Sequence, residues 1–173
     1  MNRVLVVVDY QKDFVNGALG FEGAETIEDA ILDLIQEFKN SGDMVMFTKD
    51  THFENYMDTV EGHHLPAPHC IKGTDGHRLT PKVEGASEYY PVFEKNTFPS
   101  LTLGNALAGM NPREIHLCGL VSDICVFSNA IMAKAACPNA EIYIHRNASE
   151  SYDHEMQEKT YEVAEHLHIN IVD

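Results

Sequence analysis

The sequence predicts an α/β protein, a three-layer α/β/α sandwich whose central sheet has about six mostly parallel strands. Short apolar runs alternate along the chain with segments in which apolar residues recur every three or four positions. The first run, residues 4–8, is apolar without interruption, as expected for a central strand buried on both faces. Because a strand, a helix and a second strand follow one another from there, a right-handed crossover and a parallel pair are expected.

Residues 25–40 form the clearest helical pattern. Their apolar side chains recur at three- and four-residue steps, and Gly42 follows near the point where the helix would end. Residues 53–90 lose this period and are rich in glycine, proline and histidine. Loops of this length inside a compact domain are usually functional, so we expect this segment to cover the active edge of the sheet.

The remaining elements are shorter. Further strands are predicted at residues 44–48, 92–94, 115–118, 141–145 and 169–172. Further helices are predicted at residues 101–107, 124–136 and 153–166. The last helix is expected to turn four residues inward: Met156, Thr160, Val163 and Ala164. The length and the lack of repeats indicate that residues 1–173 form a single domain.

The composition is acidic, with 27 Asp and Glu against 12 Lys and Arg and a formal net charge of -15. Nucleic acids and anionic membranes draw protein affinity from Lys and Arg, so neither is an expected partner. No apolar run approaches the roughly 20 residues of a membrane helix. The segment Met1-Asn2-Arg3 leads directly into the first strand, and no signal peptide is expected. These features favour a soluble, cytoplasmic protein with reduced cysteines, and they leave homo-oligomerisation open.

Cys125 is the candidate nucleophile. Residues 115–118 are predicted to be a buried strand that ends at Gly119, and Ser122 or Asp123 can cap the helix that follows. Open α/β sheets bind ligands at the carboxyl ends of their strands. The N–H groups of a helix start favour a thiolate over a thiol, which predicts a lowered pKa for Cys125. The alternative is that Cys125 is a small buried apolar residue.

Asp9 and Lys95 each follow a predicted apolar strand. An ammonium group beside a cysteine lowers the pKa of the thiol. A carboxylate can accept the thiol proton and later hand it to a departing amine. The alternatives are that Asp9 caps a turn and that Lys95 lies on the surface.

Asp50 and His52 alternate after the second predicted strand, so that both side chains can point the same way. His69 can return to them from the long loop, and Glu61 is a further candidate ligand. One carboxylate and two imidazoles suit a divalent metal ion, with zinc expected first and iron or manganese as alternatives. Ten histidines in one chain also supply such pairs by chance.

Three stretches resemble motifs of the isochorismatase-like cysteine hydrolases, a superfamily that includes the nicotinamidases and pyrazinamidases. Residues 119–126, Gly-Leu-Val-Ser-Asp-Ile-Cys-Val, resemble its nucleophile motif, with Ser122 where Thr is more frequent. Residues 9–14 resemble its opening motif and residues 95–100 its lysine motif. The resemblance implies the strand order 3-2-1-4-5-6 and a catalytic set of Asp9, Lys95 and Cys125.

The resemblance also implies the surroundings of the nucleophile. It places Phe14 in the substrate pocket and a cis peptide bond between Leu120 and Val121. It makes the backbone N–H groups of Val121 and Cys125 the oxyanion hole.

Residues 50–52 and 68–70 resemble the metal motifs of nicotinamidases, in which the metal holds the pyridine nitrogen of the substrate. The metal ligands implied here are Asp50, His52 and His69. Nicotinamidases commonly carry a stacking Trp shortly before the loop histidine. This chain has no Trp, and Leu65-Pro66-Ala67 takes that place.

The resemblance implies an amidase that converts nicotinamide, or a similar small aromatic carboxamide, to the acid and ammonia through a Cys125 thioester. Such an enzyme would serve pyridine nucleotide salvage. One alternative is a relative that acts on another small amide. The other is a non-catalytic metal-binding or redox protein of the same fold.

Overall fold

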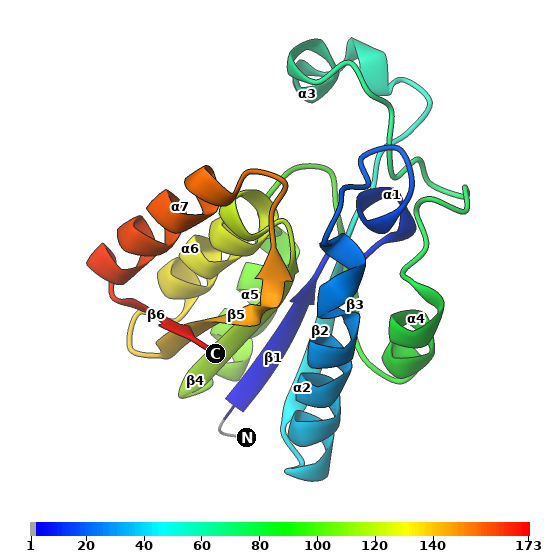
Figure 1. Cartoon of the computed structure of the whole chain (residues 1–173). Helices are drawn as coiled ribbons and strands as arrows, with labels where there is room; N and C mark the ends of the chain where they lie inside the picture. Colours follow the sequence, from blue (N-terminus) through cyan, green and yellow to red (C-terminus); the bar gives the residue numbers. More distant parts are fainter. Residues whose placement is uncertain (1–2) are drawn as a thin grey trace.

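The computed structural model describes residues 3–173, and at its centre six strands form one sheet in the order β3-β2-β1-β4-β5-β6 (Figure 1). The strands are β1 (Arg3–Val8), β2 (Met44–Asp50), β3 (Val92–Lys95), β4 (Glu114–Leu120), β5 (Glu141–Glu150) and β6 (Ile169–Val172). All neighbouring strands in this sheet are parallel. The predicted α/β fold and the strand order implied by the resemblance are confirmed.

Helices cover both faces of the sheet (Figure 1). On one face lie α1 (Lys12–Val15), α2 (Glu28–Asn40) and α4 (Pro81–Ser87). On the other face lie α5 (Leu101–Met110), α6 (Phe127–Ala136) and α7 (His154–His166). The result is the predicted three-layer sandwich.

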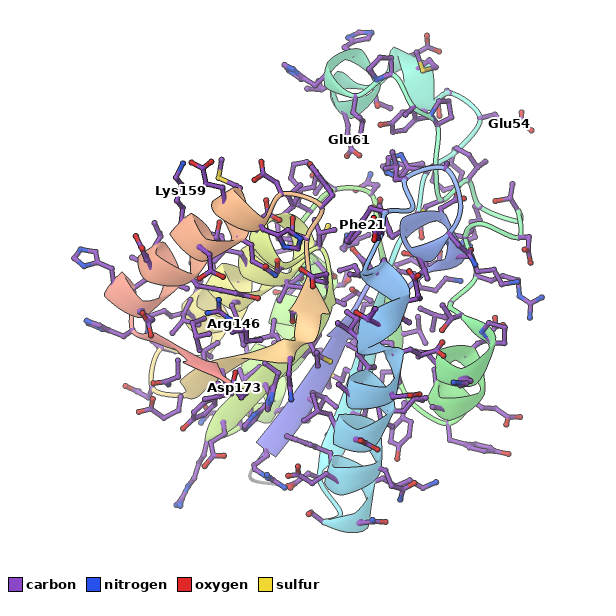
Figure 2. The ribbon with its side chains drawn as sticks, in the orientation of Figure 1. Phe21, Glu54, Glu61, Arg146, Lys159 and Asp173 are labelled. Atoms are coloured by element: carbon purple, nitrogen blue, oxygen red, sulfur yellow. The ribbon has the colours of Figure 1, made fainter. Side chains whose placement is uncertain are left out.

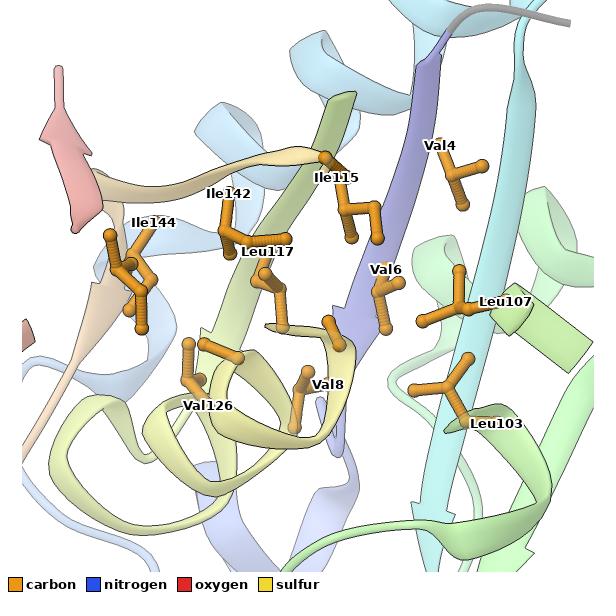
Figure 3. Close-up of a cluster of buried hydrophobic side chains, with 14 of the residues drawn as sticks. Val4, Val6, Val8, Leu103, Leu107, Ile115, Leu117, Val126, Ile142 and Ile144 are labelled. Carbon is orange, nitrogen blue, oxygen red and sulfur yellow. The ribbon is translucent and has the colours of Figure 1, made fainter. Parts of the chain in front are cut away.

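Strand β1 shows why its sequence is apolar without interruption. Val4, Val6 and Val8 face the layer of α5 and α6, in the cluster shown in Figure 3. Leu5 and Val7 face α2, and all five side chains are fully buried. Because fully burying such a side chain stabilises the fold by about 1.5–3 kcal/mol, this strand is fixed from both sides.

Strands β2 and β3 extend beyond their apolar runs. The end of β2 includes Lys49 and Asp50, and β3 ends on Lys95. Asp50 and Lys95 are partners in the register of these two strands. Apolar runs mark the part of a strand that helices cover. Polar residues at the end of a strand still pair with the neighbouring strand, but a prediction from apolar runs misses them. Asp50 and Lys95, two of the candidate site residues, therefore lie on the ends of the strands themselves.

Two predicted helices begin as other kinds of turn. The helix expected at residues 25–40 starts with the 3-10 turn η1 (Ala24–Ile27), which follows Gly23 in a left-handed conformation. The helix expected at residues 124–136 starts with the π-helical turn η3 (Ser122–Val126), and α6 begins after it. Ser122 and Asp123 therefore lie inside this turn and do not cap it, which corrects the expectation. The position before the turn is Val121, whose side chain makes no capping hydrogen bond.

The inward face of α7 differs from the prediction. Met156 and Val163 are 47% and 49% exposed, so their expected inward orientation is wrong. The buried face instead consists of Gln157, Thr160, Tyr161 and Ala164, which recur at three- and four-residue steps. Gln157 turns inward because its amide donates hydrogen bonds to the hydroxyl groups of Ser122 and Tyr161.

The long segment after β2 contains the 3-10 turn η2 (Tyr56–Asp58) and the short helices α3 (Val60–His64) and α4. Figure 1 shows α3 projecting beyond the carboxyl end of β1. This agrees with the expectation of an excursion over the active edge. Within residues 3–173, no helix combines the length and the apolar composition needed to cross a membrane. The signal-peptide expectation concerns Met1 and Asn2, which lie outside the described residues.

Candidate active site

Asp9 lies at the point where β1 leaves the sheet, and its side chain is fully buried. Its backbone is left-handed, with φ of 47°, and its Oδ1 accepts a hydrogen bond of 2.7 Å from the hydroxyl of Thr48. Its Oδ2 lies 2.5 Å from the ammonium of Lys95. Lys95 is buried as well, and its Nζ also donates to the carbonyl oxygen of Thr97. The alternative that Lys95 is a surface residue is therefore wrong.

Cys125 follows β4 in the chain and lies beside Lys95 and Asp9. Gly119 allows β4 and β1 to approach, because a Cβ at this glycine would lie only 2.0 Å from the carbonyl oxygen of Val8. The Leu120–Val121 peptide bond that follows is cis, as the resemblance implies. The thiol of Cys125 then lies 3.6 Å from the Nζ of Lys95.

Burial is the largest influence on the pKa values of Cys125 and Asp9. It raises the pKa of the Cys125 thiol well above its ordinary value, and the attraction of Lys95 offsets this only in part. The expectation of a lowered pKa is thus not met in the described geometry. Burial also raises the pKa of Asp9, against the opposing effect of Lys95. Cys125, the candidate nucleophile, therefore rests as a thiol, and the carboxylate of Asp9 is a stronger base than an exposed aspartate.

A second group of side chains converges beside this set. The Oδ2 of Asp50 lies 2.9 Å from the Nε2 of His52 and 3.3 Å from the Nε2 of His69. The Oε1 of Glu61, from α3, lies 3.4 Å and 3.6 Å from the same two nitrogen atoms. The four ligand atoms all lie within 4.8 Å of one another. Figure 2 shows Glu61 pointing from α3 toward the sheet.

These four residues fit a divalent metal ion. Metal–ligand bonds of about 2.0–2.2 Å place neighbouring donor atoms about 2.8–3.6 Å apart. The distances from the carboxylate oxygens to the imidazole nitrogens here, 2.9, 3.3, 3.4 and 3.6 Å, lie in this range. The Nδ1 of His69 donates to the carbonyl oxygen of Ala67 at 2.8 Å, which leaves its Nε2 lone pair for the group. Burial lowers the pKa of His52, but hydrogen bonds with Asp50 and Glu61 outweigh it and raise this pKa to about 9. The two carboxylates therefore favour a cation at this point.

Asp50 joins the two groups, because its Oδ1 lies 3.6 Å from the Nζ of Lys95. Both groups open into one cavity of about 410 Å³. Its lining includes Cys125, Asp50, Glu61 and His69, together with the apolar side chains of Phe14, Phe21, Leu65, Phe98, Ile124 and Tyr152. His52 instead lines a neighbouring cavity of about 590 Å³, which shares Glu61 and Leu65 with the first. The structure thus brings the expected site residues together.

Some residues of the site were not identified in the sequence. Thr48 is a polar residue inside an apolar strand, and Gln11 is a fully buried amide in the opening motif. Asn129 lies in the small-residue helix α6 and donates to the carbonyl oxygens of Cys125 and Phe98. For Thr48 and Asn129, a polar residue within an otherwise apolar element was the available signal, whereas Gln11 lies in a polar stretch and has no such signal. For Phe21 and Tyr152 the sequence carries none, because the fold alone brings them to the cavity.

Comparisons with known proteins agree with this geometry. The family model for the Isochorismatase domain matches residues 3–173. A protein of Bacillus subtilis, described as the uncharacterized isochorismatase family protein PncA, is 32% identical over 90% of each chain. The solved structure of the nicotinamidase/pyrazinamidase PncA from Bacillus subtilis is 31% identical over both entire chains, with a TM-score of 0.89. The pyrazinamidase of Pyrococcus horikoshii in complex with zinc is 26% identical, covers 100% of this chain and 99% of its own, and has a TM-score of 0.87.

Proposed function

The chain belongs to the isochorismatase family and is an amidase hydrolase, and we propose that it converts nicotinamide, or a similar small aromatic carboxamide, to the acid and ammonia. The contact between Asp9, Lys95 and Cys125 supports the amide chemistry. The group of two histidines and two carboxylates, of which Asp50, Glu61 and His69 line the same cavity as Cys125, supports an aromatic substrate with a ring nitrogen. The names of the similar solved structures, a nicotinamidase/pyrazinamidase and a pyrazinamidase, point the same way.

In this proposal Asp9 moves the proton in both halves of the reaction. It takes the proton of the Cys125 thiol as the sulfur attacks the amide carbonyl carbon. It then gives this proton to the amide nitrogen, so that the C–N bond breaks and ammonia leaves a thioester on Cys125. Asp9 next accepts a proton from water as the water oxygen attacks the thioester. The C–S bond breaks, the sulfur regains the proton, and the acid is released.

The remaining residues of the set hold charge in place. Lys95, between Asp9 and the sulfur, stabilises whichever of the two is negative at each step. The N–H groups of Val121 and Cys125 are proposed to receive the oxyanion of the tetrahedral intermediate. Phe14 contributes an apolar wall for the ring.

Asp50, His52 and His69 are the proposed metal ligands, and Glu61 is added to them because its carboxylate lies against both imidazoles. Zinc is the first expectation, with iron or manganese as alternatives. When bound, such an ion supplies an open position that can take the ring nitrogen. We also propose a cytoplasmic location, since the four cysteines of the described chain are free and the cytosol keeps thiols reduced.

The test is ammonia release from nicotinamide, pyrazinamide and benzamide, with and without a chelator. Chelation is expected to raise KM at least about tenfold for nicotinamide and much less for benzamide, which lacks the ring nitrogen. Equal kinetics for nicotinamide and benzamide would contradict a role for the metal in holding the ring.

A different small amide is the second candidate. Leu65-Pro66-Ala67 stands where nicotinamidases commonly have a stacking Trp, and Leu65 lines a cavity of about 410 Å³ with room for more than one ring. Ammonia release from none of the three aromatic amides would favour this candidate.

A further inference from the structure

The end of β1 leaves part of β2 without a neighbouring strand. The register of β1 with β2 runs as far as Val7 and Phe47, and β1 turns out of the sheet at Asp9. Asp50 lies beyond this point, on the last position of β2. On its other side β2 continues to pair with β3, where the N–H of Thr51 donates to the carbonyl oxygen of Lys95. The backbone N–H and C=O of Asp50 therefore face the space that β1 has left.

The side chain of Gln11 fills that space. Its Oε1 accepts a hydrogen bond of 2.7 Å from the backbone N–H of Asp50, and its Nε2 donates to the carbonyl oxygen of Asp50 at 2.9 Å. One carboxamide thus offers the acceptor and the donor that the two peptide units flanking a residue of an adjoining parallel strand would offer. The side chain is fully buried, so water does not compete for these bonds.

Gln11 also reaches the two other segments of the site. Its Nε2 donates a second hydrogen bond of 2.9 Å, to the carbonyl oxygen of His77, in the loop that carries His69. Its own backbone N–H donates to the carbonyl oxygen of Asp9 at 2.7 Å. The turn with the catalytic carboxylate, the end of β2 and the metal-site loop therefore meet at one residue, the last two at its side chain.

We propose that Gln11 is a positioning residue that holds Asp50 for both the metal group and the catalytic set. This inference rests on the proposed function, since it assumes that the group around Asp50 binds a metal. Asp50 is the residue whose backbone Gln11 holds and whose carboxylate lies against His52, His69 and Lys95. A small rotation of its backbone would move that carboxylate relative to all three.

The carboxamide is needed for a specific reason. It uses two N–H groups and one oxygen at once, and the corresponding acid has no N–H to offer two carbonyl oxygens. Gln11→Glu keeps the shape and the acceptor but loses both donors. Gln11→Met keeps the approximate size and loses all three hydrogen bonds.

Zinc binding tests the proposal without relying on turnover. We expect both variants to raise the zinc Kd at least about tenfold, measured on the metal-free protein by competition with a chromogenic chelator. Gln157→Met is the matched control, because it removes a buried glutamine with two hydrogen bonds on α7, away from the metal group. We expect it to lower thermal stability and to leave the zinc Kd unchanged.

Each outcome separates this inference from the proposed function. Zinc binding to the wild type and to a folded Gln11 variant with equal affinity would overturn the inference alone. Zinc binding by none of the proteins, wild type included, would overturn the metal site and the inference with it. If Gln11→Met does not fold, Gln11→Glu decides, because it retains the acceptor for Asp50.

Discussion

Cys125→Ala is expected to lower kcat for amide hydrolysis at least about 100-fold, a loss of at least about 2.7 kcal/mol of transition-state stabilisation. The variant keeps Asp9, Lys95 and the cavity but has no atom that can form the thioester. Because Cys125 is 6% exposed and alanine fills most of its volume, the fold should be retained. Initial rates of ammonia release, together with thermal unfolding of the same samples, measure both effects.

Cys137→Ala is the control for this change. Cys137 is also buried and free, but it lies at the end of α6 within the apolar cluster. The Cys137→Ala variant should lose some stability and keep its turnover. A Cys125→Ala protein with turnover similar to Cys137→Ala would show that the sulfur of Cys125 is not the nucleophile.

Lys95→Met should impair both activity and stability. The side chains of Lys95 and Asp9 are 2% and 0% exposed, so the variant leaves a buried carboxylate without its partner. Breaking a buried pair in this way costs about 3–5 kcal/mol in the free energy of unfolding. Turnover should fall at least about 100-fold, because nothing then balances the charge that moves between Asp9 and the sulfur.

Lys72→Met is the matched control, since Lys72 pairs with Glu94 on the surface, where the two side chains are 50% and 41% exposed. An exposed pair of this kind contributes about 0–1 kcal/mol. Chemical denaturation of both variants gives the comparison. Equal, small losses of stability would contradict the buried ion pair.

The stability loss of Lys95→Met should also depend on pH. Burial raises the pKa of Asp9, and without the opposing effect of Lys95 it rises further above the unfolded value of about 4. The folded variant then holds a proton that the unfolded chain has released, so its stability falls as the pH rises through this range. Denaturation should therefore separate variant and wild type more at pH 8 than at pH 5.

Much of this site could be predicted from the sequence because its residues stand at the ends of apolar runs. Asp9 and Cys125 follow runs that are apolar because helices cover both sides of the sheet. In a parallel sheet these ends meet at one edge. Lys95 and Asp50 are found by the same rule, although each lies on the last position of its strand and not after it.

The features that could not be predicted from the sequence depend on contacts between distant segments. The pKa of Cys125 is set by how deeply the fold buries the sulfur, and the position of a residue at the start of a helix does not report that depth. Gln11 acts on Asp50 because β1 ends early, which a strand pattern does not specify. The inward orientation predicted for Met156 is wrong because polar side chains, Gln157 among them, form hydrogen bonds inside the fold.

A thioester on Cys125 would partition between water and hydroxylamine. Hydroxylamine and water both attack a thioester, so nicotinamide turnover in its presence should yield the hydroxamate at the expense of the acid. The hydroxamate fraction should rise with hydroxylamine concentration, while ammonia release does not slow and Cys125→Ala forms neither product. Ammonia release that yields only the free acid at every hydroxylamine concentration would contradict an acyl-enzyme on Cys125.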